Sequence, residues 1–179
     1  IEPLIADSQG TPEMTRTTGR FIVEKPGGPD AMRWVEEPAS PLQAGEVRVR
    51  HEAIGVDFID TQIRSGLMPA NLPTGLGFAG VGIAEEVGAG VDHIRRGQRV
   101  AYMYFSAGSY GQERVVPGDR VVALPQQDLA PDIAAGALFR GLTAWYLTQR
   151  LRHVGPGQVA LVHAAAGGVG LIQIGRAHV

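Results

Sequence analysis

The run from Leu161 to Ile172, LVHAAAGGVGLI, places small residues and glycines between two apolar stretches. A glycine turn between a buried strand and a helix lets the backbone approach a pyrophosphate, and free N–H groups at the helix start then face the phosphate oxygens. Compared with the pattern GxGxxG, this run has Ala165, Gly167 and Gly170 at the three glycine positions. One partial match is weak evidence, because an ordinary strand-to-helix turn has a similar composition. The pattern alone leaves both interpretations open.

The composition describes a chain of nearly balanced charge without cysteine. Of its 179 residues 44% are hydrophobic and 19% are charged, and the formal net charge is −2. This charge argues against a nucleic-acid partner, and no apolar run reaches the roughly 18 residues of a membrane-spanning helix. Without cysteine the chain has no disulfide and no thiolate metal ligand. We therefore expect a cytoplasmic protein with neither a nucleic-acid nor a membrane partner.

The elements that must position the glycine turn change in kind along the chain. From Arg20 to Leu124, short strands separated by Gly, Pro and Asp turns predict a partly open antiparallel barrel, with a short helical insert over 57–64. Apolar residues at helical spacing over 132–151 predict one long helix, or two broken near Gly141. The apolar run 158–163 predicts a strand covered on both faces. The fold class is thus mixed β and α/β, with a β domain over 14–130 and the start of an α/β domain over 131–179.

Both ends of the chain depart from this pattern. Residues 1–13 lack a sustained period, so we interpret them as a flexible extension and Met14 as the natural start. The segment IGRAHV over 174–179 equals the translation of a common sequencing adapter, ATC GGA AGA GCA CAC GTC. We expect the natural reading frame to end near Ile172 or Gln173, with a genuine divergent helix as the alternative.

Four motifs along the chain point to a family. The segments AIGVDFIDT (53–61), IRSGL (63–67), RGLT (140–143) and HAAAGGVG (163–170) resemble the zinc-independent quinone oxidoreductases of the medium-chain dehydrogenase/reductase superfamily, the group that includes zeta-crystallin. The similarity runs in the family's order from about residue 20 to residue 172. It implies a GroES-like catalytic domain followed by the truncated start of a Rossmann domain, with NADPH in the cleft between them.

The resemblance implies particular site residues. The nicotinamide side of the cofactor cleft would be lined by Phe58, Ile59, Asp60, Thr61 and Gln62, with Thr143 beside the cofactor. The pyrophosphate turn would consist of Gly167, Gly168, Val169 and Gly170. Two departures bear on the substrate: Asp57 stands where relatives often have Asn, and Gln62 where many have Tyr. The choice between NADPH and NADH stays open, because the second Rossmann strand that selects between them lies beyond this chain.

Several of these residues have structural alternatives. Asp60 and Arg64 are four apart on a predicted helix and could form an ordinary surface pair. His163 could be a core histidine, and Thr143 could bond back to its own helix backbone. The tyrosines on predicted strands could stack against a quinone or simply pack in the core; these are Tyr102, Tyr104 and Tyr110.

The chain lacks the residues that would hold a catalytic zinc ion. Zinc-dependent relatives carry Gly-His-Glu where this chain has Gly75-Leu76-Gly77, and leucine and glycine side chains offer no lone pair. The five histidines show no ligand spacing. We therefore predict no metal site and hydride transfer without a Lewis acid, and we assign no single catalytic residue.

Three functional hypotheses follow from the residues and the resemblance. The first is an NADPH-dependent quinone oxidoreductase, homodimeric at full length, of which this fragment is inactive on its own. The second keeps the fold and reduces an enoyl or other α,β-unsaturated carbonyl acceptor, with Gln62 favouring the change. The third is a non-enzymatic GroES-like interaction module or a crystallin-like structural protein.

Overall fold

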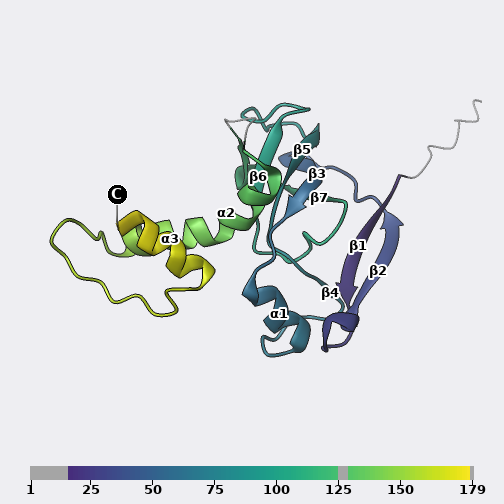
Figure 1. Ribbon diagram of the computed structural model, residues 1–179. Helices are drawn as coiled ribbons and strands as arrows, with labels where there is room; N and C mark the ends of the chain where they lie inside the picture. The colour runs from purple at the N-terminus through teal and green to yellow at the C-terminus, as the bar shows by residue number, and fades with distance from the viewer. Residues whose placement is uncertain (1–15, 125–128, 178–179) are drawn as a thin grey trace, which may run out of the picture.

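The computed structural model describes residues 16–124 and 129–177. Its main unit is a curled antiparallel sheet in the order β7-β3-β5-β6-β8, accompanied by a smaller sheet in the order β2-β1-β4 (Figure 1). The strands are β1 (Thr17–Val23), β2 (Met32–Pro38), β3 (Glu46–Ile54), β4 (Thr74–Gly75), β5 (Ala79–Val87), β6 (Arg99–Met103), β7 (Glu113–Pro117) and β8 (Val121–Ala123). The short antiparallel strands confirm the partly open barrel predicted from the sequence.

The helices are few and lie mostly after the barrel. Helix α1 (Phe58–Ser65) confirms the predicted insert, and short 3-10 turns cover Pro29–Ala31 and Gly118–Arg120. Helix α2 (Pro131–Trp145) continues directly into a π-helical segment (Tyr146–Leu151), so the predicted long helix is confirmed without a break at Gly141. Helix α3 (Gly168–Ala177) packs beside α2 at the end of the molecule away from the β1–β2 ribbon (Figure 1).

Alternating apolar residues of the strands build the core. Val47 and Val49 of β3 are fully buried with Val100 of β6 and Val116 of β7, because side chains at every second position share one face of a strand. A second cluster joins β1 to α1 through Val23, Ile63, Leu76 and Phe78, and a third packs the start of α2 against β5 and β6. The first cluster fills the barrel, and the second and third hold α1 and α2 on it.

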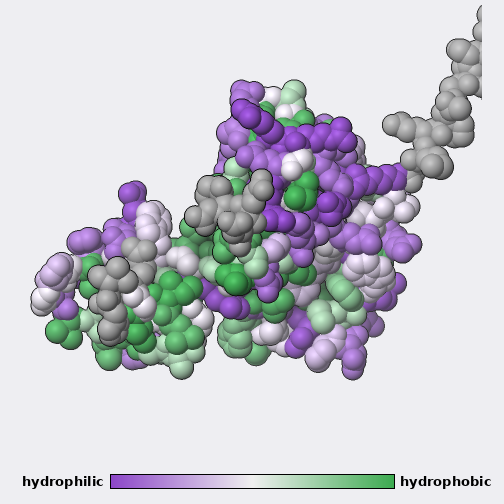
Figure 2. All heavy atoms as spheres, turned by 45° about the horizontal axis from the view of Figure 1, so that its top comes forward, coloured by the Kyte–Doolittle hydropathy of each residue, from purple (hydrophilic) through white to green (hydrophobic). Residues whose placement is uncertain are grey.

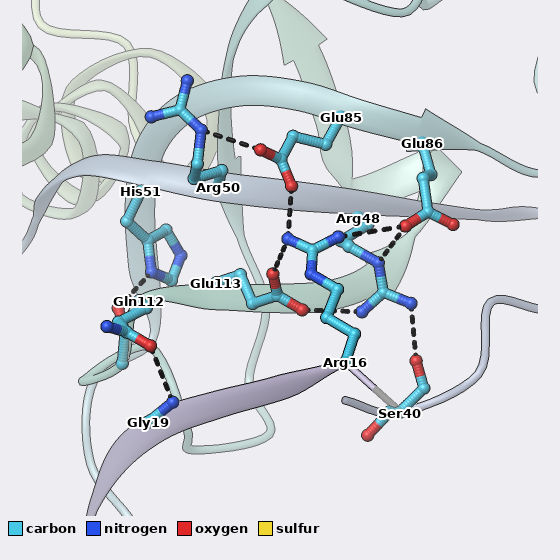
Figure 3. Close-up of polar contacts among 11 residues, drawn as sticks. Arg16, Gly19, Ser40, Arg48, Arg50, His51, Glu85, Glu86, Gln112 and Glu113 are labelled. Carbon is cyan, nitrogen blue, oxygen red and sulfur yellow. Dashed lines mark hydrogen bonds and ion pairs between the residues drawn. The ribbon is translucent and has the colours of Figure 1, made fainter. Parts of the chain in front are cut away.

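The outward face of the barrel carries a network of arginines and glutamates (Figure 3). Arg48 of β3 lies between Glu86 of β5 and Glu113 of β7, and Arg16 also pairs with both glutamates. Each of the three strands supplies one of these charges, so the network ties β3, β5 and β7 together through side chains as well as through the backbone.

The predicted strand over 158–163 is wrong. The structure has no strand there, and Val159 and Leu161 are 100% and 85% exposed. A buried parallel strand needs neighbours that satisfy its backbone N–H and C=O groups, and within residues 16–124 and 129–177 no strand lies beside this segment. Apolar composition alone therefore does not make a strand here.

The end of the molecule built by α2 and α3 exposes more apolar surface than the barrel does. Figure 2 shows hydrophobic side chains gathered over α2 and α3, whereas the face over the barrel is mostly hydrophilic. Leu142, Trp145 and Tyr146 on α2 and the following segment are each more than a third exposed. Among the described residues no helix is long and apolar enough to cross a membrane.

Candidate functional site

A cleft of about 380 Å³ lies where α1, α2 and α3 meet. Three sequence-distant segments line it: the start of α1 with Asp57, Phe58 and Ile59, the middle of α2 with Phe139 and Arg140, and the start of α3 with Gly168 and Val169. The structure thus brings five predicted site residues together, Asp57, Phe58, Ile59, Gly168 and Val169. It adds Phe139 and Arg140, which were not predicted.

The start of α1 is fixed by a reciprocal capping box. Asp57 is the N-cap residue, its side chain accepts from the backbone of Asp60, and Asp60 Oδ2 accepts from the Asp57 N–H at 3.0 Å. Before the helix, a Cβ on Gly55 would lie 3.0 Å from the Ala135 carbonyl oxygen. A glycine at 55 therefore lets the chain pass close under α2 and brings the first turn of α1 to the cleft.

Asp60 anchors α1 to the barrel. Its Oδ1 accepts from the Gly77 N–H at 2.9 Å, the Tyr110 hydroxyl donates to its Oδ2 at 3.2 Å, and only 2% of the residue is exposed. The alternative of an ordinary surface pair with Arg64 is therefore wrong, because the Asp60 carboxylate points inward to the Asp57 and Gly77 N–H groups and the Tyr110 hydroxyl. Burial first, and then the neighbouring Asp60 charge, raises the pKa of Tyr110 well above its usual value, so Tyr110 stays a neutral donor.

Arg140 connects the first turn of α1 with the glycine turn. Its Nη2 donates to the Val56 carbonyl at 2.7 Å, and its Nε lies 3.3 Å from Asp57 Oδ1. Burial raises the pKa of Asp57, and the Arg140 charge works against that rise by stabilising the carboxylate. Sequence reasoning missed Arg140 as a site residue, although it opens the RGLT motif one residue after Phe139.

The glycine turn has the close contacts that glycine allows. A Cβ on Gly170 would lie 2.5 Å from the Ala164 carbonyl oxygen and 2.7 Å from Ala165 Cα, both of them backbone atoms. Ala164 has a φ of 50°, in the left-handed region that alanine rarely adopts. The Gly167 N–H donates to the Ala164 carbonyl at 2.8 Å, which closes the turn directly before α3.

The other predicted cofactor contacts are placed less directly. Thr61, Gln62, Thr143, Gly167 and Gly170 do not line the cleft. The Thr143 hydroxyl donates to the Phe139 carbonyl at 2.8 Å, as the structural alternative for this residue predicted, and the Thr61 hydroxyl donates to the Phe58 carbonyl at 2.7 Å. No ligand contact in the structure tests these five residues, so they remain predictions.

Tyr102 and Tyr110 serve the core rather than an open stacking surface. Tyr102 is buried, its hydroxyl lies 2.7 Å from His51 Nε2 and 2.9 Å from Ser109 Oγ, and its ring stacks on that of His51. Tyr104 lies under the Arg114 guanidinium, 5.1 Å from ring centroid to Cζ. The packing interpretation is therefore confirmed for Tyr102, whose ring no substrate can reach.

Phenylalanines, rather than tyrosines, form the aromatic surface beside the cleft. The Phe105 ring stands 6.0 Å from the Phe78 ring and 6.0 Å from the Phe139 ring, and Phe105 is 67% exposed. Phe139 lines the cleft, and Phe58 at its edge is also largely exposed. The cleft consequently has an apolar aromatic side and a polar side, the latter with Asp57 and Arg140.

The segment at the zinc position of zinc-dependent relatives is occupied by core packing. Leu76 is 1% exposed in the cluster with Val23, Ile63 and Phe78. Across the residues for which the structure gives positions, no group of three or more His, Cys, Asp or Glu side chains could hold a metal ion.

The chain is similar to known proteins in both sequence and structure. Residues 43–126 match the family model described as the alcohol dehydrogenase GroES-like domain. The chain is 43% identical over 155 residues to quinone oxidoreductase 1 of Escherichia coli, covering 86% of this chain and 47% of that protein. It is 39% identical over 158 residues to 2-haloacrylate reductase of Burkholderia sp., again covering 86% and 47%.

Solved structures agree with these relatives. The Escherichia coli quinone oxidoreductase complexed with NADPH superposes with a TM-score of 0.84 at 40% identity, covering 89% of this chain and 49% of that one. The CurK enoyl reductase superposes with a TM-score of 0.81 at 26% identity, covering 90% and 51%. The chain spans about half the length of these relatives. The predicted family resemblance and GroES-like fold are therefore confirmed.

Proposed function

We propose that this chain belongs with the quinone oxidoreductases of the medium-chain dehydrogenase/reductase superfamily, which it resembles in sequence and fold, and that it forms part of an NADPH-dependent quinone oxidoreductase. The observation that carries the proposal is the single cleft in which the start of α1 meets Gly168 and Val169 of the glycine turn. A dinucleotide needs both parts, since its pyrophosphate lies at a glycine turn and its nicotinamide reaches the catalytic domain.

In this proposal different residues along the cleft contact different parts of the cofactor. Gly168 and Val169, with Gly167 and Gly170 behind them, hold the pyrophosphate, and Thr143 lies nearby on α2. Phe58, Ile59, Thr61 and Gln62 border the nicotinamide, while Asp60 holds α1 in place instead of contacting the cofactor. NADPH is the proposed cofactor because two similar structures contain it, the Escherichia coli quinone oxidoreductase and a mycobacterial protein.

The bound cofactor would supply the hydride, and the chain would orient it and exclude water. A quinone is planar and electron-poor, and the Phe105–Phe139 pair, whose rings meet edge to face, offers apolar aromatic surface beside the cleft. Leucine at 76 supplies no metal ligand, so we propose that the reaction needs no zinc. The domain division near residue 130, a small-molecule partner, a cytoplasmic location and a homodimer at full length belong to the same proposal.

A second acceptor class is favoured by one specific observation. The relative from Burkholderia sp. is a 2-haloacrylate reductase, and its identity to this chain, 39%, is close to that of the quinone oxidoreductases. An α,β-unsaturated acid would use the polar side of the cleft, where Arg140 can face a carboxylate. The two acceptor classes thus differ in which side of the cleft they need.

The proposal is tested by completing the protein. Residues 16–172 would be fused to the half of the Escherichia coli quinone oxidoreductase that this chain does not match, and NADPH oxidation would be followed with 1,4-naphthoquinone and with 2-chloroacrylate. We expect turnover with the quinone that persists after exhaustive chelation. A folded fusion that binds NADPH but reduces neither acceptor contradicts the proposal, and a rate that chelation abolishes and zinc restores contradicts its metal-free chemistry.

The chain as given should bind NADPH only weakly and should therefore not turn over quinone. Micromolar binding requires about 8 kcal/mol, whereas an anion site at a partly buried helix end supplies at most about 2 kcal/mol. Titration of the purified chain with NADPH checks this, and saturable micromolar binding would show that the cleft in this chain is sufficient by itself.

A further inference from the structure

The Arg140 side chain lies against the glycine turn and forms an ion pair with one carboxylate, that of Asp57. A Cβ on Gly168 would lie 2.5 Å from Arg140 Cδ and 2.8 Å from its Nε, so the guanidinium stem lies directly against the turn. The side chain is 38% exposed and lines the cleft. Arg140 is therefore positioned at the end of the cleft where the glycine turn is, within reach of any group that enters there.

The contacts of Arg140 leave donor capacity unused. A guanidinium has five N–H groups, and those of Arg140 are engaged through Nη2 with the Val56 carbonyl and through Nε with Asp57. Over the residues with assigned positions, no hydrogen bond of Arg140 Nη1 is found. The Asp57 contact uses one carboxylate oxygen at 3.3 Å, which is long for a charge-assisted hydrogen bond.

We propose that Arg140 is a phosphate-binding residue of this cleft and that Asp57 competes with the phosphate for its guanidinium. The planar guanidinium can engage two phosphate oxygens at once, which a single Asp57 oxygen at 3.3 Å does not match. The proposal rests on the proposed function only in assigning the phosphate to a dinucleotide. Arg140 and Gly168 line one cleft and lie against each other, and this supports phosphate binding without reference to a dinucleotide.

Competition between Asp57 and the phosphate predicts a different effect of substitution on phosphate affinity than a purely structural ion pair does. If Asp57 and Arg140 only held the cleft open together, removing either charge would weaken a ligand at the turn. If they compete, Asp57→Asn frees the guanidinium and strengthens phosphate binding, whereas Arg140→Gln weakens it. Asparagine also keeps the size of the side chain and its ability to cap α1.

The experiment titrates the isotopically labelled 179-residue chain with inorganic pyrophosphate at low ionic strength. The backbone amides of Gly168 and Val169 and the Nε–H of Arg140 are followed by NMR. One ion pair near the surface corresponds to a change of about two- to five-fold in affinity, and low salt keeps that effect visible. We expect Arg140→Gln to weaken binding by about this factor and Asp57→Asn to strengthen it by about this factor. The control Arg152→Gln, which removes an exposed cation of the same charge, should leave the affinity unchanged.

The two substitutions overturn different parts of the proposal. Unchanged pyrophosphate affinity in Arg140→Gln would show that Arg140 is not a ligand, and weaker binding in Asp57→Asn would show that the pair is a scaffold. If Arg140→Gln does not fold, Arg140→Lys replaces it, with the expectation of weaker binding because the forked donor is lost; equal affinity contradicts the proposal. Pyrophosphate binding needs no hydride transfer, so a fusion that fails to oxidise NADPH would refute the proposed function while these results stand.

Discussion

Arg48 and Arg140 both pair with buried carboxylates, but their surroundings are opposite. The Arg48 side chain is 6% exposed and donates to Glu86 at 2.7 Å, Glu113 at 2.8 Å and the Ser40 carbonyl at 2.6 Å. The Arg140 side chain is 38% exposed, meets one carboxylate at 3.3 Å and borders an open cleft. The hydrogen-bond donors of Arg48 are engaged in the barrel, whereas those of Arg140 at the cleft are only partly engaged.

The difference separates a structural charge from one that is available to a ligand. A buried ion pair whose hydrogen-bonding groups are all engaged resists change, because removing one partner leaves the other charge buried and unpaired. A pair whose guanidinium is more than a third exposed costs less to open, because water and ligands can take over the partners of the arginine. The barrel therefore serves as the rigid support, and the cleft carries the exchangeable contacts.

The largest expected effect is the loss of Arg48. Arg48→Ala removes three hydrogen bonds and leaves the buried carboxylate of Glu113 with Arg16 as its remaining ionic partner, so the free energy of unfolding should fall by about 3 kcal/mol, the lower end of the cost of breaking a buried pair. Its matched control is Arg50→Ala, since Arg50 pairs with Glu85 at 2.8 Å but is half exposed, and should cost less than about 1 kcal/mol. Urea denaturation of both variants measures the difference; equal losses would contradict the distinction between the buried pair of Arg48 and the exposed pair of Arg50.

The next effect concerns the anchor of α1. Asp60→Ala removes the acceptor of the Gly77 N–H, the Asp57 N–H and the Tyr110 hydroxyl, which should cost about 2–3 kcal/mol. Asp132→Ala, at the exposed start of α2, is the matched control and should cost about 0.3–1 kcal/mol. Thermal unfolding compares the two, and a loss below that of the control would mean that Asp60 is not an anchor.

His51 links the stability of the barrel to pH. Burial, the largest cause, and the nearby Arg114 charge lower the pKa of His51 from its ordinary 6.5, so the folded chain holds the ring neutral. The unfolded chain takes up the proton more readily. The stability from this group is therefore complete above pH 6.5 and falls as the pH drops through 6.5 toward the folded pKa, by up to about 1.4 kcal/mol per pH unit.

Denaturation at pH 7 and pH 5.5 measures this loss in the parent chain. His51→Gln should be less stable at pH 7, because contacts to the Tyr102 hydroxyl and the Gly111 carbonyl change, but should lose less on acidification. The control His153→Gln removes an exposed histidine and should keep the parent's pH dependence. A parent-like slope in His51→Gln would assign the acid sensitivity to other groups.

The smallest expected effect on stability is that of the cleft pair. Arg140→Gln should lower the free energy of unfolding by less than about 1 kcal/mol, because the Arg140 side chain is solvent-accessible and its contact with Asp57 is long. Chemical denaturation checks this value. A loss as large as that of Arg48→Ala would make Arg140 a structural residue and would contradict the view that a ligand can replace Asp57 as its partner.

The sequence predicted the parts of the fold that local pattern controls. The short strands separated by turns over 20–124 predicted the β domain, and the apolar helical period over 132–151 predicted one long helix or two broken near Gly141, of which the structure has the unbroken form. The glycine turn also follows from local composition, since Gly170 can be recognised before its contacts are known. The strand predicted over 158–163 failed because strand formation depends on neighbouring strands, which an apolar run does not reveal.

The contacts that the sequence did not predict join residues distant in sequence. The spacing of Asp60 and Arg64 favours a surface pair, but the true partners of Asp60 include Gly77 and Tyr110, which are 17 and 50 residues away. Arg140 likewise meets Val56 from 84 residues away. Only the closed barrel and the packing of α2 bring these groups together, so a pattern within one segment cannot identify them.

The most direct test of the account is the affinity of the fused protein for NADPH with and without a side chain at 168. Gly168→Val places a branched side chain where Arg140 and the phosphate would lie, so the dissociation constant should rise about ten-fold or more while circular dichroism shows an intact fold. If the dissociation constant stays unchanged in a folded variant, the dinucleotide does not lie at this turn, and the proposed cofactor site is wrong.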